Sequence, residues 1–207
     1  MIGYRNRTTD GHILTIEDPV EFVHRHGRSL ITQREVGTDT DSFDAALKSA
    51  LRQAPDVILL GEIRSQETME FALSFAETGH LCMATLHANN ANQAIERILH
   101  LVPVEKHRQL LYDLSFNLKA IVAQQLIPTR DGQGRRAAFE LLVSTPLVKD
   151  ILLKGEMHRL KEVMAKSREQ GMMTFDQSLF DLYRQGVIGY SEALAYADSP
   201  NDVRLMI

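Results

Sequence analysis

The stretch DVILLGEIR, residues 56–64, decides how this sequence folds. Residues 57–60 form a short apolar run, which is typical of a strand buried within a parallel sheet. A glycine and then a carboxylate, Glu62, follow the run directly. In α/β proteins that hydrolyse nucleotides, an acid at the end of a buried strand holds Mg²⁺ or orients the attacking water. The stretch therefore predicts an α/β fold in which Glu62 serves phosphoryl transfer.

Strands and helices are predicted to alternate over the first half of the chain. Apolar runs bounded by turn residues mark the strands, and apolar residues at helical spacing mark the helices. The expected strands are residues 12–16, 29–36, 57–60 and 81–86, and the expected helices start after a cap at Asp41, cover about 65–78, and start again at Asn89 or Asn90. The polar pattern of residues 29–36 suits an edge strand. This alternation implies parallel strands joined by right-handed crossovers.

The pattern changes towards the C-terminus. A long helix is expected over about 105–122, and two short strands flank a turn at residues 130–134. Beyond Pro146 only short helices are expected, at residues 148–153, 156–167, 175–185 and 191–197. We therefore expect two domains, residues 1–145 and a small all-helical domain at residues 146–207.

Composition excludes several classes of protein. The 44% hydrophobic and 24% charged residues are ordinary for a globular chain of 207 residues. A net charge of −4 gives no electrostatic reason to expect nucleic acid. Cys82 is the single cysteine, which excludes an intrachain disulfide and a cysteine-based zinc site. No apolar run approaches the roughly 20 residues of a membrane span, and the charged N-terminus does not resemble a signal peptide.

The sequence lacks a phosphate-binding loop. No Gly-x-x-x-x-Gly-Lys-Ser/Thr motif occurs among its residues. Such a loop supplies backbone amides that surround phosphates and a lysine that meets their charge. The chain thus carries half of a nucleotide site, and we expect it to be a piece of a longer protein.

Three acidic residues, Glu17, Asp18 and Glu21, follow the predicted strand at residues 12–16. Ligands of open α/β sheets lie beyond the carboxyl ends of the strands. Together with Glu62, Glu17 and Glu21 are candidates to hold Mg²⁺, through waters because Mg²⁺ keeps several of them. The alternative for the acidic cluster alone is a solvated loop behind a helix cap.

Two histidines and two arginines are further candidates. His80 and His87 precede and follow the strand at residues 81–86, so they belong at opposite edges of the sheet, about 20 Å apart. His87 is a candidate to meet a γ-phosphate or to relay a subunit contact, whereas His80 suits a cap on the preceding helix or a packing role. A structural role is the commoner fate of a lone histidine. Arg64 and Arg97 are candidate phosphate or inter-subunit groups, with a surface ion pair as the alternative.

Three segments together resemble one family. Residues 15–24 resemble the acidic box of the type II/type IV secretion ATPases, residues 56–64 their Walker B segment, and residues 77–87 their histidine box. Order, spacing and flanks agree, strongly over residues 12–145 and more weakly to the end. The resemblance implies a RecA-like P-loop NTPase core, here without its Walker A segment, followed by a helical domain.

Within the family the sequence resembles the pilus retraction ATPases PilT and above all PilU. Residues 33–37 and 171–177 are of the retraction type, and the single cysteine excludes the four-cysteine module of the extension ATPases. Residues 147–149, Leu-Val-Lys, depart from the PilT pattern towards PilU. Met1 corresponds to a position behind the P-loop, so the chain resembles a C-terminal fragment without the PAS-like domain.

The resemblance also implies roles. Glu62 would polarise water, Glu17 and Glu21 would belong to the acidic box near Mg²⁺, and the histidine box would supply His80 and His87. Arg64 and Arg97 would act at the nucleotide or at the subunit seam.

The implied parent is a cytoplasmic ATPase that binds ATP and Mg²⁺ and drives pilus retraction and twitching motility. It would form a homo-hexamer or join a paralogous retraction ATPase at the cytoplasmic face of the inner membrane, against the pilus platform protein. The fragment alone is expected to be inactive.

Two other functions remain open from the sequence. One is a non-catalytic interaction module that docks on a complete pilus motor ring. The other is a metal-dependent hydrolase that uses His87 with the acidic residues.

Overall fold

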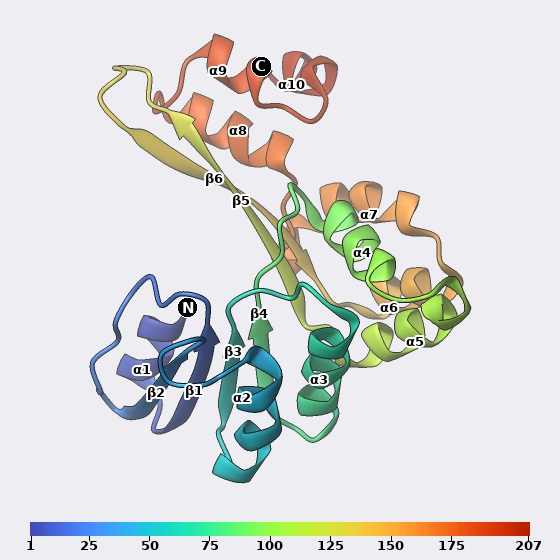
Figure 1. The fold of residues 1–207 in the computed structure, drawn as a ribbon. Coiled ribbons are helices and arrows are strands. Elements are labelled where there is room, and N and C mark those ends of the chain that lie inside the picture. The colour runs from blue at the N-terminus through green and yellow to red at the C-terminus, as the bar shows by residue number, and fades with distance from the viewer. The chain divides into compact units, whose positions relative to one another are not determined.

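The computed structural model describes all residues, Met1–Ile207. The chain divides into two compact units, Met1–Leu86 and His87–Ile207. Figure 1 shows a parallel sheet with its helices in the first unit and a long hairpin surrounded by helices in the second. None of the helices has the length and apolar character that crossing a membrane requires.

The first unit is an α/β layer built on a four-stranded sheet. Its strands lie in the order β2-β1-β3-β4 and all neighbours are parallel. The elements in chain order are α1 (Ile2–Thr8), β1 (Gly11–Glu17), β2 (Ser29–Glu35), α2 (Phe43–Ala50), the 3₁₀ turn η1 (Leu51–Gln53), β3 (Val57–Leu60), α3 (Gln66–Glu77) and β4 (Leu81–Ala84). The α/β class and the four expected strands are thereby confirmed.

The two central strands explain why the sheet forms. β3 is wholly apolar and β1 carries an apolar centre, and Leu14, Ile16, Ile58 and Leu60 have no exposed surface. Parallel strands with both faces covered take such continuous apolar runs. The more polar β2 lies at one end of the sheet, as its sequence predicts, and β4 lies at the other.

One helix cap differs from the prediction by one residue. The sequence suggests Asp41 as the cap of α2, but the side chain of Ser42 accepts the amide of Ala45 instead. Serine is as good a cap as aspartate, so composition alone does not choose between neighbours. Ser65 caps α3 in the same way through the amide of Thr68.

The second unit surrounds an antiparallel hairpin. Its strands β5 (Ala120–Pro128) and β6 (Arg135–Val143) pair over their whole length and form a sheet of their own. The other elements are α4 (Ala91–His100), η2 (Val104–Lys106), α5 (His107–Asn117), α6 (Pro146–Lys154), η3 (Met157–Arg159), α7 (Leu160–Lys166), η4 (Arg168–Gln170), α8 (Phe175–Arg184), α9 (Tyr190–Ala195) and α10 (Pro200–Met206).

The prediction of one helix over residues 105–122 is wrong. The α-helix ends at Asn117, and β5 begins at Ala120. Leu118 and Ile121 fit helical spacing, but Leu118 takes an extended conformation and Ile121 pairs with Leu142. Periodicity does not separate a helix from a strand where apolar residues run on across the boundary. The sequence analysis also misses α10, and it joins η3 and α7 into one helix.

The compact units divide the chain at a different place from the boundary expected near residue 145. α6 packs in one hydrophobic cluster with α4 and β6, through residues that include Ala91, Ile95, Leu142 and Ile151. A second cluster joins α8 and α10 to both strands of the hairpin, through residues that include Ile127, Ala138, Phe175 and Val203. The hairpin and the helices that follow it therefore share cores, which local spacing does not reveal.

Candidate functional site

The carboxyl ends of β1, β3 and β4 meet at one edge of the first unit's sheet. Ile16 pairs with Leu60, and Leu60 with Ala84. The backbone continues this alignment beyond the strands, because the amide of Gly61 donates to the carbonyl of Ile16 at 2.7 Å. Glu17 and Glu62 consequently stand at the same edge, where ligands of such sheets bind.

Gly61 is essential to this arrangement, and the sequence analysis did not single it out. A β-carbon at this position would lie 3.1 Å from the Cα of Glu17 and 3.1 Å from the carbonyl oxygen of Ile16. Only a residue without a side chain lets the two backbones approach so closely. The glycine between an apolar strand and an acid is the sequence signal that identifies the contact.

Thr85 ties the third strand into the same edge. Its hydroxyl donates to the carbonyl of Gly61, and its own carbonyl accepts the amide of Ile63 at 3.1 Å. The backbone on both sides of Glu62 is thus held by one residue that follows β4. Fixed backbone of this kind limits the positions open to the Glu62 side chain.

Glu17 is a buried and oriented carboxylate, with 9% of its surface exposed. Its Oε1 accepts the hydroxyl of Thr15 at 2.6 Å and Nε2 of Gln33 at 3.0 Å. Buried charge is costly unless hydrogen bonds stabilise it, and these two neighbours provide them. One carboxylate oxygen is therefore fixed by the protein.

Glu62 is paired with Arg64. The Glu62 side chain is 12% exposed, and its Oε2 accepts Nε of Arg64 at 2.6 Å. The guanidinium of Arg64 also lies 3.5 Å from Oδ2 of Asp18, at the end of the neighbouring strand β1. The hydrogen bond to Glu62, helped by its charge and that of Asp18, raises the pKa of Arg64. Arg64 thus joins two acids, Asp18 and Glu62, that lie 44 residues apart in the sequence.

Residues of β2 hold the loop that carries Glu21. The amide of Val20 donates to Oε2 of Glu35 at 2.9 Å, and the amide of His24 to Oε1 of Gln33 at 2.6 Å. Gln33 also donates to the carbonyl of Phe22 at 3.0 Å. In the sequence, Gln33 and Glu35 indicate an edge strand and the retraction type of the family; in the structure they also shape the acidic loop. Glu21 itself is exposed in this loop.

The acids do not form a ready metal cage. No three or more histidine, cysteine, aspartate or glutamate side chains converge as a metal cluster would require. Glu17, Glu21 and Glu62 therefore do not form a common set of direct ligands. Mg²⁺ needs few protein ligands because it retains waters and binds substrate phosphates. Glu17 and Glu62, at one sheet edge, fit contact with such an ion through water.

His80 lies at the opposite, amino-terminal end of β4. Its Nδ1 is 3.2 Å from the carbonyl of Phe75 and 3.0 Å from the hydroxyl of Thr78, and its ring meets Phe75 edge-on. These contacts close the C-terminal turn of α3. They support the structural interpretation of His80 and not a contact with a nucleotide at the carboxyl edge.

His87 and Arg97 belong to the second unit. His87 follows β4 by three residues in the chain and is exposed. Arg97 is exposed in the last turn of α4, where the helix dipole favours a cation. The helix dipole therefore explains Arg97 without a nucleotide. The functional roles of His87 and Arg97 remain proposals.

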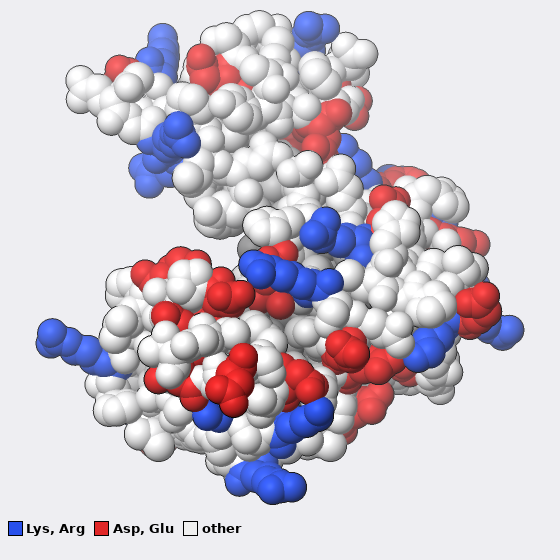
Figure 2. All heavy atoms as spheres, in the orientation of Figure 1, with Lys and Arg blue, Asp and Glu red and all other residues white.

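Acidic side chains gather on the visible face of the first unit, over its sheet and helices (Figure 2). Basic side chains appear near the loop between β5 and β6, where Arg130, Arg135 and Arg136 are exposed. A negatively charged edge suits a cation that accompanies an anionic substrate.

Comparison with known proteins identifies the family. The sequence profile described as "Type II/IV secretion system protein" matches residues 3–185. The chain belongs to this family. The acidic, Walker B and histidine segments of the sequence analysis all lie within the matched range, so the expected membership in the type II/IV secretion family is confirmed.

Two relatives of this type II/IV secretion family member are pilus ATPases. The chain is 65% identical over all its residues to the type IV pilus ATPase PilU of Pseudomonas aeruginosa, covering 54% of that protein. It is 40% identical over 202 residues to the retraction ATPase PilT of the same organism, covering 98% of this chain and 58% of PilT. The chain thus spans little more than half the length of these relatives.

A solved structure supports the same fold. The chain matches a crystal structure of the pilus retraction motor PilT with bound ADP at a TM-score of 0.90 and 41% identity. The match covers 99% of this chain and 58% of the PilT chain. The parallel α/β sheet with its helices is therefore the fold of the PilT ATPase, in agreement with the expected RecA-like core.

Proposed function

We propose that this chain is the C-terminal part of an ATPase subunit that powers type IV pilus retraction and twitching motility. The observation that carries the proposal is the pair Glu17 and Glu62 at one sheet edge, held by Gly61, Thr85 and Gln33. The similarity to PilU and PilT supports the choice of reaction and of process.

Glu62 is the group that polarises the attacking water. It is almost buried, carries one hydrogen-bonded oxygen towards Arg64, and sits on backbone fixed by Ile16 and Thr85. Arg64 pairs with the carboxylate of Glu62 and is positioned to exchange it for a phosphate oxygen. Arginine suits that exchange because its planar donors match both groups.

Glu17 provides a fixed negative charge beside Glu62. Thr15 and Gln33 orient it, so it does not need to reorganise when a substrate arrives. Glu17 and Glu62 would hold Mg²⁺ through waters, with Glu21 from the loop as an outer member. When bound, Mg²⁺ neutralises charge on the transferring phosphate.

We further propose that the parent works as a ring. The partners are further copies of the subunit in a homo-hexamer, or a paralogous retraction ATPase, and a platform protein at the cytoplasmic face of the inner membrane. His87 and Arg97 would act towards phosphate and at the subunit seam. The division into an ATPase core at residues 1–145 and a helical domain at residues 146–207 stays a functional proposal.

The experiment that tests the proposal is a comparison of Glu62→Gln with wild type in the full-length protein. The change keeps the size of the side chain and removes its charge, so hydrolysis should fall by about 10²-fold or more while ATP affinity changes little. Phosphate release and ATP binding measure the two effects. Unchanged turnover with much weaker ATP binding would contradict the assignment.

The isolated 207-residue chain serves as the second arm of that experiment. It lacks the phosphate-binding motif, so its phosphate release should equal background. Mg²⁺-dependent turnover that disappears on Glu62→Ala would overturn this expectation. A full-length protein that docks on a motor ring without any turnover would instead favour the non-catalytic interaction module.

A further inference from the structure

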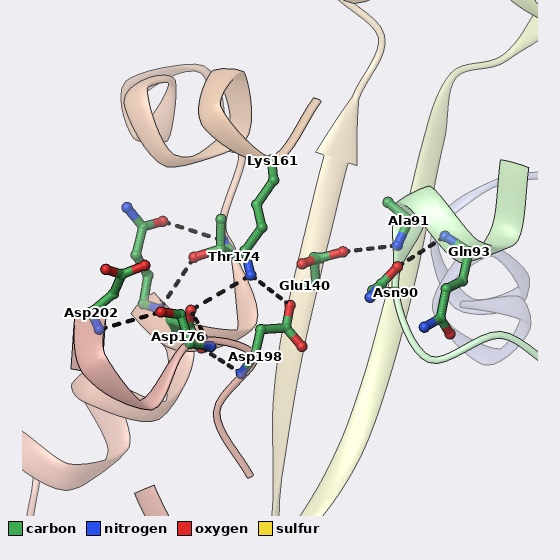
Figure 3. A network of polar contacts seen from close by, with 11 residues as sticks. Asn90, Ala91, Gln93, Glu140, Lys161, Thr174, Asp176, Asp198 and Asp202 are labelled. Carbon is green, nitrogen blue, oxygen red and sulfur yellow. Dashed lines mark hydrogen bonds and ion pairs between the residues drawn. The ribbon is translucent and has the colours of Figure 1, made fainter. Parts of the chain in front are cut away.

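Glu140 is a buried carboxylate that the proposed chemistry does not use. It lies on β6 in the middle of the hairpin, and only 2% of its surface is exposed. Its Oε1 accepts the backbone amide of Ala91 at 2.8 Å, across 49 residues of sequence (Figure 3). A charge this deeply buried needs partners, and its partners reveal its role.

Its hydrogen-bonded partner is one helix N-terminus, and a second helix N-terminus influences its pKa. Ala91 is the first residue of α4 and Phe175 is the first residue of α8. The amides of both residues act on Glu140 and lower its pKa, against the effect of burial, which is larger and raises it. The first amides of a helix have no acceptor within the helix, and the helix dipole attracts an anion there.

Neither helix can supply this acceptor itself. The cap of α4, Asn90, accepts the amide of Gln93 at 2.9 Å and leaves that of Ala91 to Glu140. The cap of α8 is Thr174, whose side chain accepts the amide of Gln177. Glu140 therefore completes the cap of α4, and the preceding residue of β6 bonds to α8, because the amide of Phe139 donates to Oγ of Ser178 at 3.0 Å.

The C-terminal helices form a connected polar group beside Glu140 (Figure 3). Asp176 of α8, 4% exposed, accepts the amides of Asp198 at 2.8 Å and Ser199 at 3.2 Å. Nζ of Lys161, on α7, lies 3.1 Å from Asp198 and 3.7 Å from Asp176. Helices α7, α8 and α10 are thus tied together, and β6, which carries Glu140, bonds to α8 through Phe139 and Ser178.

We infer that Glu140 is a positioning residue for the segment His87–Asn90, which leads from the histidine box into α4. The contact with Ala91 fixes where that segment ends, and the hydrogen bond between Phe139 of β6 and Ser178 of α8 links the end point to the C-terminal helices. A displacement of α8 on the hairpin would therefore be passed to His87. The inference rests on the proposed ATPase function, because it assigns this placement to the hydrolytic cycle.

The test uses the full-length protein with Glu140→Ala, Glu140→Gln and a matched control, Glu162→Gln. Glu162 is an exposed glutamate of α7 whose partner is Lys166 at 2.6 Å, so its change removes a charge in the same unit without touching a helix cap. Steady-state kcat and KM for ATP are measured with hydrogen–deuterium exchange over residues 87–95. Thermal unfolding reports how much protein is folded.

Glu140→Ala should lower kcat per folded molecule by about tenfold or more while KM changes by less than about threefold. Exchange should rise at the start of α4. Glu140→Gln keeps one acceptor oxygen and should restore part of both effects, and Glu162→Gln should match wild type.

The outcomes separate the inference from the function on which it rests. A wild-type protein without ATP hydrolysis overturns the proposed function. An active wild type whose Glu140→Ala variant melts earlier but keeps its kcat overturns the inference, because a merely structural residue behaves in that way. If Glu140→Ala does not fold, the Glu140→Gln variant decides the question. A wild-type kcat together with wild-type exchange refutes the positioning role. A reduced kcat together with faster exchange supports it.

Discussion

Gly61 shows how much a single residue contributes to the candidate site. Gly61→Ala places a β-carbon 3.1 Å from the backbone of Glu17, so the two strand ends must separate by a few tenths of an ångström. We expect turnover of the full-length protein to fall by about tenfold or more, with a smaller effect on unfolding. Gly134→Ala is the control, because its β-carbon meets only Thr129 at 3.8 Å. Full activity of Gly61→Ala would show that the approach of the strands does not matter.

Cys82 should be an unreactive thiol. Burial raises its pKa from 9.0 to about 12, so the neutral form persists in the folded chain well above neutral pH. Reaction with a thiol reagent at pH 8 should therefore be much slower in native than in unfolded protein. The same pKa difference makes the free energy of unfolding depend on pH. Between pH 9 and 12 only the unfolded chain loses the thiol proton, so the free energy of unfolding should fall as pH rises through that range. Equal native and unfolded reaction rates would contradict the burial.

At the scale of elements, the cap of α8 should contribute measurably to the stability of the fold. Thr174 and Gln177 form a reciprocal capping box, with hydrogen bonds of 3.3 and 3.2 Å. Thr174→Ala should lower the free energy of unfolding by about 1 kcal/mol, the usual contribution of such a cap. Ser191→Ala, an exposed hydroxyl in the same unit, should leave urea denaturation unchanged. Equal urea midpoints for Thr174→Ala and Ser191→Ala would show that the capping box does not contribute to stability.

The elements also show what sequence can and cannot predict. The strands β1, β3 and β4 are predictable because short apolar runs end in glycine, proline or polar residues. The change from α5 to β5 is not, since Leu118 and Ile121 satisfy helical spacing until the pairing with Leu142 decides otherwise. Long-range pairing of this kind has no local signature.

The candidate site likewise contains residues that the sequence predicts and residues that it does not. Glu17 and Glu62 can be predicted, because each follows an apolar strand and parallel strands bring their carboxyl ends together. The supports of the site, Gln33, Glu35 and Thr85, cannot, because side-chain contacts between strands depend on register. Glu140 was missed for the same reason: its hydrogen-bonded partner Ala91 lies on a helix 49 residues before it in the sequence.

For the molecule as a whole, we predict that residues 87–207 fold cooperatively and residues 146–207 do not. The longer segment contains both shared cores of the hairpin, whereas the shorter one loses Leu142 and Ile95 from the first and Ile127 from the second. Short helices depend on such packing for their stability. Thermal unfolding followed by circular dichroism compares the two segments. A cooperative transition in residues 146–207 alone would restore the boundary expected from the sequence.

The position of β4 at the end of its sheet has a practical consequence. The strand reads Leu-Cys-Met-Ala, with neither charge nor proline, and Leu81 is 39% exposed. End strands of soluble proteins usually carry lysine, proline or a bulge that discourages pairing with another molecule. β4 has none of these safeguards, so the purified chain should be prone to aggregation at high concentration. Light scattering against concentration, with Met83→Lys as the comparison, would show whether this strand sets the solubility limit.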